Sequence, residues 1–352
     1  MNTTNDRVHY GDLPDGRAVT LYRLHSPAGA CAEILDFGGN IHSLTVPDRR
    51  GTPGDIVMGH ETFQDQMTKM GWNCGLMGRC VNRIDQGKLF IHGKLHQLEL
   101  MGGMPFVIHG GKGNYAMKLF SAERWSDNEG DKLRLYHHDC GEGGFPGQVD
   151  VWVTYVLTPD NELQIEYRAL PTEDTVLNIT SHCYFNLAGH GSGTVANQLM
   201  QINADYFLPA AEGGLPTGEV LRVEDSVFDF TNPRRLGDGL ESNDPQIKRQ
   251  GGYDHNYCLR GAGYRQAANA YDEKSGRRMI VYTDMPGVQL YTAGNDMPGD
   301  GFKGGASYHK YDAFCLETQY FPDATAYSHF PQPIYPAGKV FESRTAFRFT
   351  VD

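Results

Sequence analysis

One carboxylate stands alone in an otherwise apolar or neutral segment near the end of the chain. Glu317 lies in the run Cys315–Asp323, which closes with a proline and an aspartate typical of a turn. Burying a carboxylate costs free energy. A partly dry pocket also raises the pKa of a carboxylate toward the range useful for a general base. Glu317 is therefore our first candidate for acid–base chemistry.

Two further segments carry groups that could work with this carboxylate. His182 lies in the strand-like run Asn178–Leu187, where it could donate a proton or could be a hydrogen-bonded core histidine. Asp254 follows two glycines and belongs either to a turn or to the edge of a binding site. Taken one at a time, the two segments favour the core histidine and the turn.

Three other polar positions could contact a ligand. Arg83, directly after Asn82, offers a planar fork of donors for a hydroxyl or a carboxylate, or for a structural ion pair. His109 precedes two glycines that would let the backbone approach a ligand closely, although it could equally be incidental to a loop. Gln289 interrupts an apolar strand, where it could contact a ligand or, more commonly, face outward.

Several kinds of site are not supported by the sequence. No His-Glu-x-x-His or Gly-x-Ser-x-Gly pattern occurs, and no Gly-x-Gly-x-x-Gly opens a strand–helix unit, so a zinc hydrolase, a serine hydrolase and a nicotinamide cofactor are unsupported. The seven cysteines are scattered, without a Cys-x-x-Cys pair, so we expect neither a metal site nor a disulfide framework. Reduced thiols of this kind suggest a cytoplasmic protein.

Charge and hydropathy restrict the partners. The 352 residues carry a formal net charge of −12 and show no basic stripe, which argues against nucleic acid and anionic membrane surfaces. No apolar run approaches the roughly 20 residues of a membrane helix, and the polar N-terminus does not resemble a secretory signal. We therefore expect neither a nucleic-acid nor a membrane partner.

The elements that would position these residues are mostly strands. Apolar and polar residues alternate over Val149–Leu157 and Leu163–Ala169, which predicts a hairpin around Thr158–Asn161. One short helix is predicted at Glu61–Met70. The 43 glycines and 18 prolines are spread evenly, without a linker, so we expect one large antiparallel β-sandwich. Further strands are expected at Cys31–Phe37, His42–Val46, Leu89–Ile91, Leu133–His137, Met279–Asp284, Gln289–Ala293 and Thr345–Val351.

The order of these segments is more specific than any one of them. Asn-Arg, His-Gly-Gly, Gly-Phe-Pro-Gly (144–147), His-x-Tyr-Phe-Asn-Leu (182–187), Gly-Tyr-Asp-His-Asn, Pro-Gly-Val-Gln and Leu-Glu-Thr-Gln-x-Phe-Pro-Asp (316–323) follow one another. This series resembles the aldose 1-epimerase (galactose mutarotase) family from about Gly11 to the C-terminus.

The resemblance implies a single domain over residues 1–352 with the all-β, galactose mutarotase-like supersandwich fold. It implies interconversion of the anomers of a hexose such as galactose or glucose, without a cofactor, by a monomer or homodimer. Glu317 would be the general base and His182 the general acid. The sugar contacts would be Asn82, Arg83, His109, Tyr184, Asp254 and Gln289.

Two alternatives stay open at this point. One is an epimerase of another saccharide, such as a disaccharide or a sugar phosphate, and the other is a non-catalytic carbohydrate-binding protein. A phosphate would need an arginine and lysine cluster, but Arg234–Arg235 and Arg277–Arg278 lie in turn-like segments that we expect to face solvent. Departures from the family pattern at Gly113–Asn114 and Ser181 leave the preferred sugar undecided.

Overall fold

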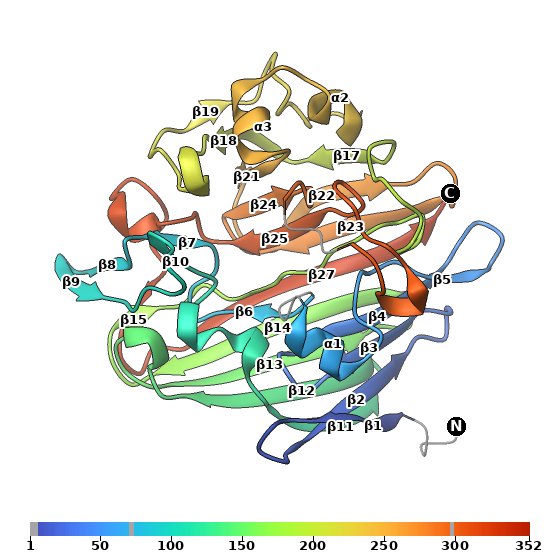
Figure 1. Cartoon of the computed structure of the whole chain (residues 1–352), viewed down its shortest axis with the longest axis horizontal. Helices are drawn as coiled ribbons and strands as arrows, with labels where there is room; N and C mark the ends of the chain where they lie inside the picture. Colours follow the sequence, from blue (N-terminus) through green and yellow to red (C-terminus); the bar gives the residue numbers. More distant parts are fainter. Residues whose placement is uncertain (1–5, 70–73, 296–298) are drawn as a thin grey trace.

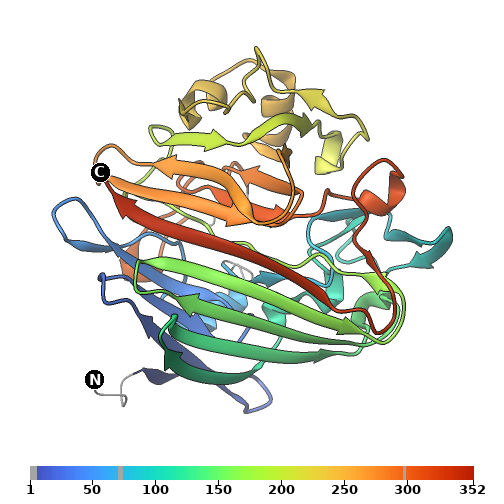
Figure 2. The ribbon, with the colours of Figure 1, turned by 180° about the vertical axis from the view of Figure 1, so that it is seen from behind.

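A computed structural model describes residues 6–69, 74–295 and 299–352. Its largest element is a twisted nine-stranded sheet that runs across the whole molecule (Figures 1 and 2). In spatial order the strands are β11 (Ser121–Asp127), β12 (Gly130–Asp139), β13 (Val149–Leu157), β14 (Glu162–Pro171), β27 (Phe341–Val351), β23 (Arg277–Thr283), β22 (Arg265–Tyr271), β17 (Leu199–Ile202) and β20 (Arg234–Arg235).

Two five-stranded sheets lie in front of this sheet in the view of Figure 1. The first packs through β2 against β12 and β13. It consists of β1 (Arg7–Asp12), β2 (Ala18–His25), β3 (Cys31–Leu35), β4 (Ile41–Pro47) and β5 (Pro53–Asp55). The second consists, in spatial order, of β19 (Leu221–Arg222), β18 (Ala204–Leu208), β21 (Asp254–Leu259), β24 (Gly287–Tyr291) and β25 (Cys315–Gln319).

Short strand pairs and helices complete the described part of the chain. The pairs are β6 (Leu76–Met77) with β16 (Thr180–Ser181), β7 (Arg83–Asp85) with β10 (Phe106–Ile108), β8 (Lys88–Ile91) with β9 (Lys94–Gln97), and β15 (Thr175–Val176) with β26 (Ile334–Tyr335). The helices are α1 (Phe63–Thr68), α2 (Leu236–Leu240) and α3 (Pro245–Gln250), and 3-10 turns include η5 (Glu212–Gly214) and η7 (Ala324–Ala326). No helix in the described ranges has the length and apolar character needed to cross a membrane.

Period-two alternation explains the long central strands. In β13, Val151, Val153 and Tyr155 are buried, whereas Trp152 and Thr154 point toward the solvent side. The strand pairs antiparallel with β14, with Val149 opposite Pro171 and Leu157 opposite Leu163, so the predicted hairpin is confirmed. One face of the hairpin joins the main hydrophobic core, and the other faces solvent.

The remaining sequence predictions hold with shifted boundaries. Each of the seven further strands overlaps an observed strand: β3, β4, β8, β12, β23, β24 and β27. The predicted helix is the shorter α1, because the Thr62 side chain caps it by accepting a hydrogen bond from the Asp65 N–H. The predicted end of that helix, Met70, lies outside the described residues.

The expectation that the arginine pairs lie in turns is wrong, because both pairs belong to strands, and the expectation that they face solvent is wrong for Arg277. This residue belongs to β23 and is only 5% exposed. Its guanidinium donates to the backbone carbonyls of Leu187 at 3.0 Å and Val46 at 3.2 Å, so it joins elements of the fold. Arg234 and Arg235 form the edge strand β20.

Candidate active site

Glu317 lies at the centre of β25, and all five residues of that strand are buried. A strand that is buried on both faces does not alternate between apolar and polar residues. This explains why the residues around Glu317 are apolar or neutral. Antiparallel pairing places Gln289 of β24 opposite Glu317 and Asn256 of β21 opposite Gln289. Three polar side chains thus stand in a row across one sheet.

His182 follows directly after β16 and faces the carboxylate. Its Nε2 lies 3.5 Å from Oε1 of Glu317, and both side chains are almost fully buried. Its backbone N–H donates to the Gly75 carbonyl at 2.9 Å, and its carbonyl accepts from the Cys74 N–H at 3.2 Å. The ring stacks on Tyr184, with 4.9 Å between the ring centroids. The histidine therefore has a fixed orientation.

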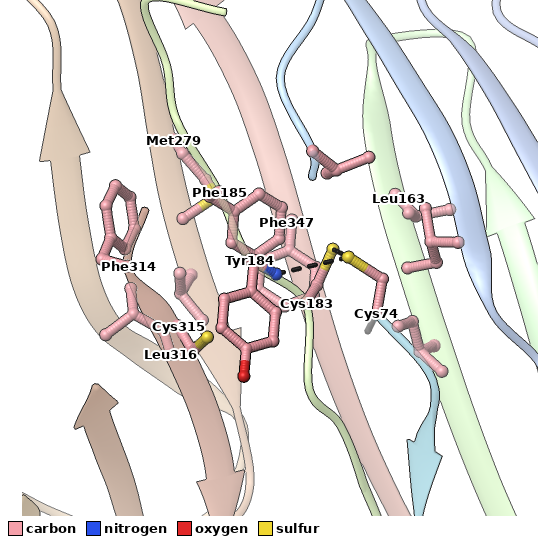
Figure 3. Close-up of a cluster of buried hydrophobic side chains, with 14 of the residues drawn as sticks. Cys74, Leu163, Cys183, Tyr184, Phe185, Met279, Phe314, Cys315, Leu316 and Phe347 are labelled. Carbon is pink, nitrogen blue, oxygen red and sulfur yellow. Dashed lines mark hydrogen bonds between the residues drawn. The ribbon is translucent and has the colours of Figure 1, made fainter. Parts of the chain in front are cut away.

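The segment after this histidine is anchored in the core (Figure 3). The thiol of Cys183 donates to Sγ of Cys74 at 3.2 Å, and the Tyr184 N–H donates to the same sulfur at 3.3 Å. The ring of Phe185 packs against Phe314, with centroids 6.1 Å apart, and also against the ring of Phe347. Since Phe314 immediately precedes β25, one cluster supports both sides of the acid–base pair.

Two loops bring Asn82 and His109 to the same place. Both residues have positive φ angles, 65° and 52° respectively. The His109 N–H donates to the Asn82 carbonyl at 3.0 Å, and the Asn82 N–H donates to Nδ1 of His109 at 3.3 Å. Gly110 continues this close approach, because a Cβ there would lie 1.9 Å from the Gly78 carbonyl oxygen. With Nδ1 accepting, the neutral His109 ring carries its hydrogen on Nε2.

Arg83, Asp254 and Gln289 extend the row of polar groups away from the pair. Nε2 of Gln289 donates to Oδ1 of Asp254 at 2.7 Å, and Nη2 of Arg83 lies 3.3 Å from Oδ2 of the same carboxylate. The Arg83 guanidinium also covers the ring of Phe106, at 5.5 Å from the ring centroid. Gln289 thus binds Asp254 from the position opposite Glu317 in the neighbouring strand.

Burial moves the two pKa values in opposite directions. It raises the pKa of Glu317 to about 8, and the charge of Asp254 adds to this rise while Arg83 opposes it. It lowers the pKa of His182 to about 4. Both shifts disfavour a charged form in a dry environment. At neutral pH the pair therefore holds one titratable proton. Glu317 carries it when both residues are neutral, and His182 carries it when both are charged.

All eight residues predicted from the sequence belong to this cluster or to its wall. Oε2 of Glu317 and Nδ1 of His182 lack a hydrogen-bond partner in the described part of the chain. Of the two alternatives for Gln289, the outward-facing one is wrong, because the residue is 2% exposed. Tyr184 packs on the face of the His182 ring. Sequence reasoning missed Tyr291, whose ring meets the His182 ring edge-on at 6.2 Å, although the residue lies two positions after Gln289.

Three residues of the site also have the types and spacing that could hold a metal ion. Ligand atoms of His109, His182 and Glu317 lie within 4.8 Å of one another. However, the Asn82 N–H donates to Nδ1 of His109, which leaves the hydrogen on Nε2. A nitrogen that carries a hydrogen cannot ligate a metal, so the geometry favours His109 as a hydrogen-bond donor.

Comparison with known proteins agrees with this geometry. The sequence model of the aldose 1-epimerase family matches residues 20–348. The chain is 37% identical to galactose mutarotase of Bos taurus over 98% of both chains, and 32% identical to aldose 1-epimerase of Escherichia coli over 96% of this chain and 97% of that one. The crystal structure of galactose 1-epimerase from Lactobacillus acidophilus superposes with a TM-score of 0.86 at 26% identity, covering 98% of each chain.

Proposed function

The chain belongs to the aldose 1-epimerase family, and from that premise we propose how its site interconverts the α and β anomers of a hexose such as galactose or glucose. The observation that carries the proposal is the buried pair of Glu317 and His182, 3.5 Å apart. Each has one polar atom without a partner in the described residues, and these atoms can meet the substrate.

Ring opening needs one base and one acid. Glu317 removes the proton from the O1 hydroxyl, and the electrons of that O–H bond form the C1–O1 double bond. The C1–O5 bond breaks, its electron pair goes to O5, and His182 delivers a proton there. Rotation about C1–C2 exposes the other face of the aldehyde. Ring closure returns each proton along the reverse path and gives the other anomer.

The single proton of the pair suits this scheme. The reactive arrangement is a Glu317 carboxylate with a protonated His182, which the two residues reach by moving their proton over 3.5 Å. A sugar hydroxyl that donates to the carboxylate favours the charged form. Ring opening leaves Glu317 protonated and His182 neutral, and ring closure restores the starting state, so the pair holds one proton throughout and no cofactor is needed.

Neighbouring donors stabilise the oxygens on which charge develops. The Nε2–H of His109 is directed by the hydrogen bond at its other ring nitrogen. Arg83 and Asp254 present a donor and an acceptor to ring hydroxyls, together with Asn82 and Gln289. Fixed donors aimed at developing charge in a dry pocket are among the largest contributions to catalysis.

The names of the relatives support a hexose, with galactose and glucose as the first candidates. A sugar phosphate is disfavoured, because Arg277, which could have belonged to a phosphate site, is buried and bonded to backbone carbonyls. We propose a cytoplasmic location, supported by seven cysteines that are all free thiols, and a monomeric or homodimeric state.

Polarimetry tests the proposal. Freshly dissolved α-D-galactose and α-D-glucose should change rotation much faster with the protein than without it. Glu317→Gln keeps the shape of the side chain but removes the base, so the rate should fall by about 100- to 10,000-fold. A Gln variant that retains most of the wild-type rate would assign the base to another residue.

A further inference from the structure

The outer face of the nine-stranded sheet is hollowed, on the side away from the second five-stranded sheet and its acid–base pair. Val151 and Val153 of β13 point into the main core, so Trp152 and Thr154 point outward. Figure 2 looks onto this outer side, with β12, β13, β14 and β27 in the foreground. Three hollows of about 390, 340 and 220 Å³ lie on it.

The three hollows share walls and form one groove, which we call the outer groove. Arg134 lines all three, and Thr154, Glu166 and Arg344 line both of the larger ones. These four residues form a row across four neighbouring strands, because Arg134 stands opposite Thr154, Thr154 opposite Glu166, and Glu166 opposite Arg344. Three strand spacings give the row a length of about 14 Å.

Positive and negative charges balance in the largest hollow of the outer groove. Its lining contains three arginines and three carboxylates: Arg134, Arg168, Arg344, Glu166, Asp284 and Glu342. An anion or a cation in this hollow would meet as many like charges as opposite ones, and like charges brought together cost affinity. The hollow therefore suits a neutral ligand that carries both hydrogen-bond donors and acceptors.

The middle of the row offers groups that the fold does not pair with each other. The Arg344 guanidinium stands opposite Glu166 in register but lies over the Tyr264 ring, 3.8 Å from the ring centroid. In the neighbouring row, Arg168 and Glu342 do form an ion pair, at 3.6 Å. Among the described residues the Glu166 carboxylate has no ion-pair partner. Glu166 can therefore accept from one ligand hydroxyl while Arg344 donates to another.

Aromatic side chains line the same groove. Trp152 borders the largest and the smallest hollow, and Trp125 borders the third. The Trp152 ring lies between Tyr136, with 5.4 Å between the ring centroids, and the Arg168 guanidinium, 5.0 Å from its centroid. Aromatic rings offer large apolar surfaces, and the C–H face of a hexose packs on such a surface while its hydroxyls bond to neighbouring polar groups.

We propose that the outer groove binds a neutral oligosaccharide chain, at a site separate from the one that anomerises a free sugar. The row from Arg134 to Arg344 is longer than one pyranose ring, so several linked hexoses can lie along it. Trp152 holds the C–H face of one ring, and Glu166 and Arg344 bind hydroxyls of the next. This site goes beyond the proposed function and does not depend on it.

Calorimetry with two neutral probes, maltoheptaose and cellohexaose, tests the proposal. Both are first reduced to alditols, so that neither has an anomeric hydroxyl, and saturating galactose keeps the acid–base site occupied. At least one of the two chains should bind to the wild type. The same measurement on Glu317→Gln should give an unchanged affinity, so the outer groove and the proposed anomerisation can fail separately.

Two variants and a matched control locate the binding site. Trp152→Ala should weaken chain binding by about threefold to tenfold, the value of one aromatic contact. Glu166→Ala, which removes a hydrogen bond to a charged group, should weaken it by about tenfold or more. Tyr206→Ala is the control, because Tyr206 of β18 is 37% exposed and lies under Arg222, 5.7 Å from its ring centroid, outside the groove. It should bind as the wild type does, and all three variants should keep the wild-type anomerisation rate, which shows that they fold.

Three results would overturn the proposal. The first is that neither neutral chain binds, or that Trp152→Ala and Glu166→Ala bind as tightly as the wild type. The second is tighter binding of a heparin hexasaccharide than of both neutral chains, which would make the groove a site for anions. The third is a wild-type dimer in light scattering that Trp152→Ala dissociates, which would make the groove an interface between two copies of this chain.

Discussion

At the scale of single residues, the chemistry of this site comes from burial. Burial is the largest cause of both pKa shifts: it raises the pKa of Glu317 to about 8 and lowers the pKa of His182 to about 4, while the charges of Asp254 and Arg83 make smaller contributions. The consequence is a pair that holds one proton across the neutral range. Such a pair can act in both directions, as a reaction that interconverts two anomers requires.

His109 gives a first prediction at this scale. His109→Ala removes the Nε2–H donor that faces the developing charge, so kcat should fall by about 100- to 1,000-fold while KM changes little. Steady-state kinetics on galactose would measure both constants. A rise in KM with kcat unchanged would instead make His109 a ground-state sugar contact.

The identity of these residues was predictable from sequence, but their partners were not. A lone carboxylate in an apolar run already suggested Glu317. The contact of Gln289 with Asp254 depends on which strands pair and in which register, since one step along a strand reverses the facing side. This is why the local sequence favoured an outward-facing Gln289, whereas the residue is buried.

At the scale of elements, a buried ion pair holds the loop that delivers Asn82 and Arg83. Arg79, 1% exposed, donates to both carboxylate oxygens of Asp139 in β12, at 2.8 and 2.9 Å. The Tyr115 hydroxyl donates to the same carboxylate at 2.8 Å. The loop is therefore tied to the nine-stranded sheet four residues before Arg83.

Arg79→Met should destabilise the protein, because it leaves the Asp139 carboxylate buried without its cation. We expect the free energy of unfolding to fall by about 3–5 kcal/mol, measured by urea denaturation. Arg17→Met is the matched control, since Arg17 pairs with Asp15 on the exposed surface and surface pairs contribute little. Equal effects of the two variants would contradict a structural role for the buried pair.

Strands with one buried and one exposed face could be predicted from their alternating sequence, whereas strands buried on both faces could not. The β13–β14 hairpin shows one buried and one exposed face. In contrast, β25 is buried throughout, so no period of two marks it. The ion pair of Arg79 and Asp139 joins residues 60 positions apart, and such a contact leaves no local sequence signal.

At the scale of the whole molecule, one hydrophobic core extends beneath the site. The main cluster includes side chains from both five-stranded sheets and from the nine-stranded sheet, such as Ile34, Val153 and Leu290. Phe185 and Phe314 of the same cluster lie under the acid–base pair. The site thus depends on the assembled sandwich, and no single sheet contains it.

This continuity predicts that residues 1–352 unfold as one domain. Calorimetry should show a single transition, and fluorescence and far-UV circular dichroism should report the same midpoint. The calorimetric and van't Hoff enthalpies should agree. Two separate transitions, one of them removing activity and the other not, would contradict a single domain.

The central claim is that one proton shared by Glu317 and His182 drives the reaction, and the pH dependence of kcat/KM tests it most directly. Below about pH 4 a second proton removes the base, and above about pH 8 loss of the shared proton removes the acid. After subtraction of the uncatalysed rate, we expect a bell-shaped profile whose limbs lie near those pH values. The residual activity of Glu317→Gln should lack the alkaline limb. Activity that stays constant from mildly acidic pH to pH values well above 8 would contradict the account.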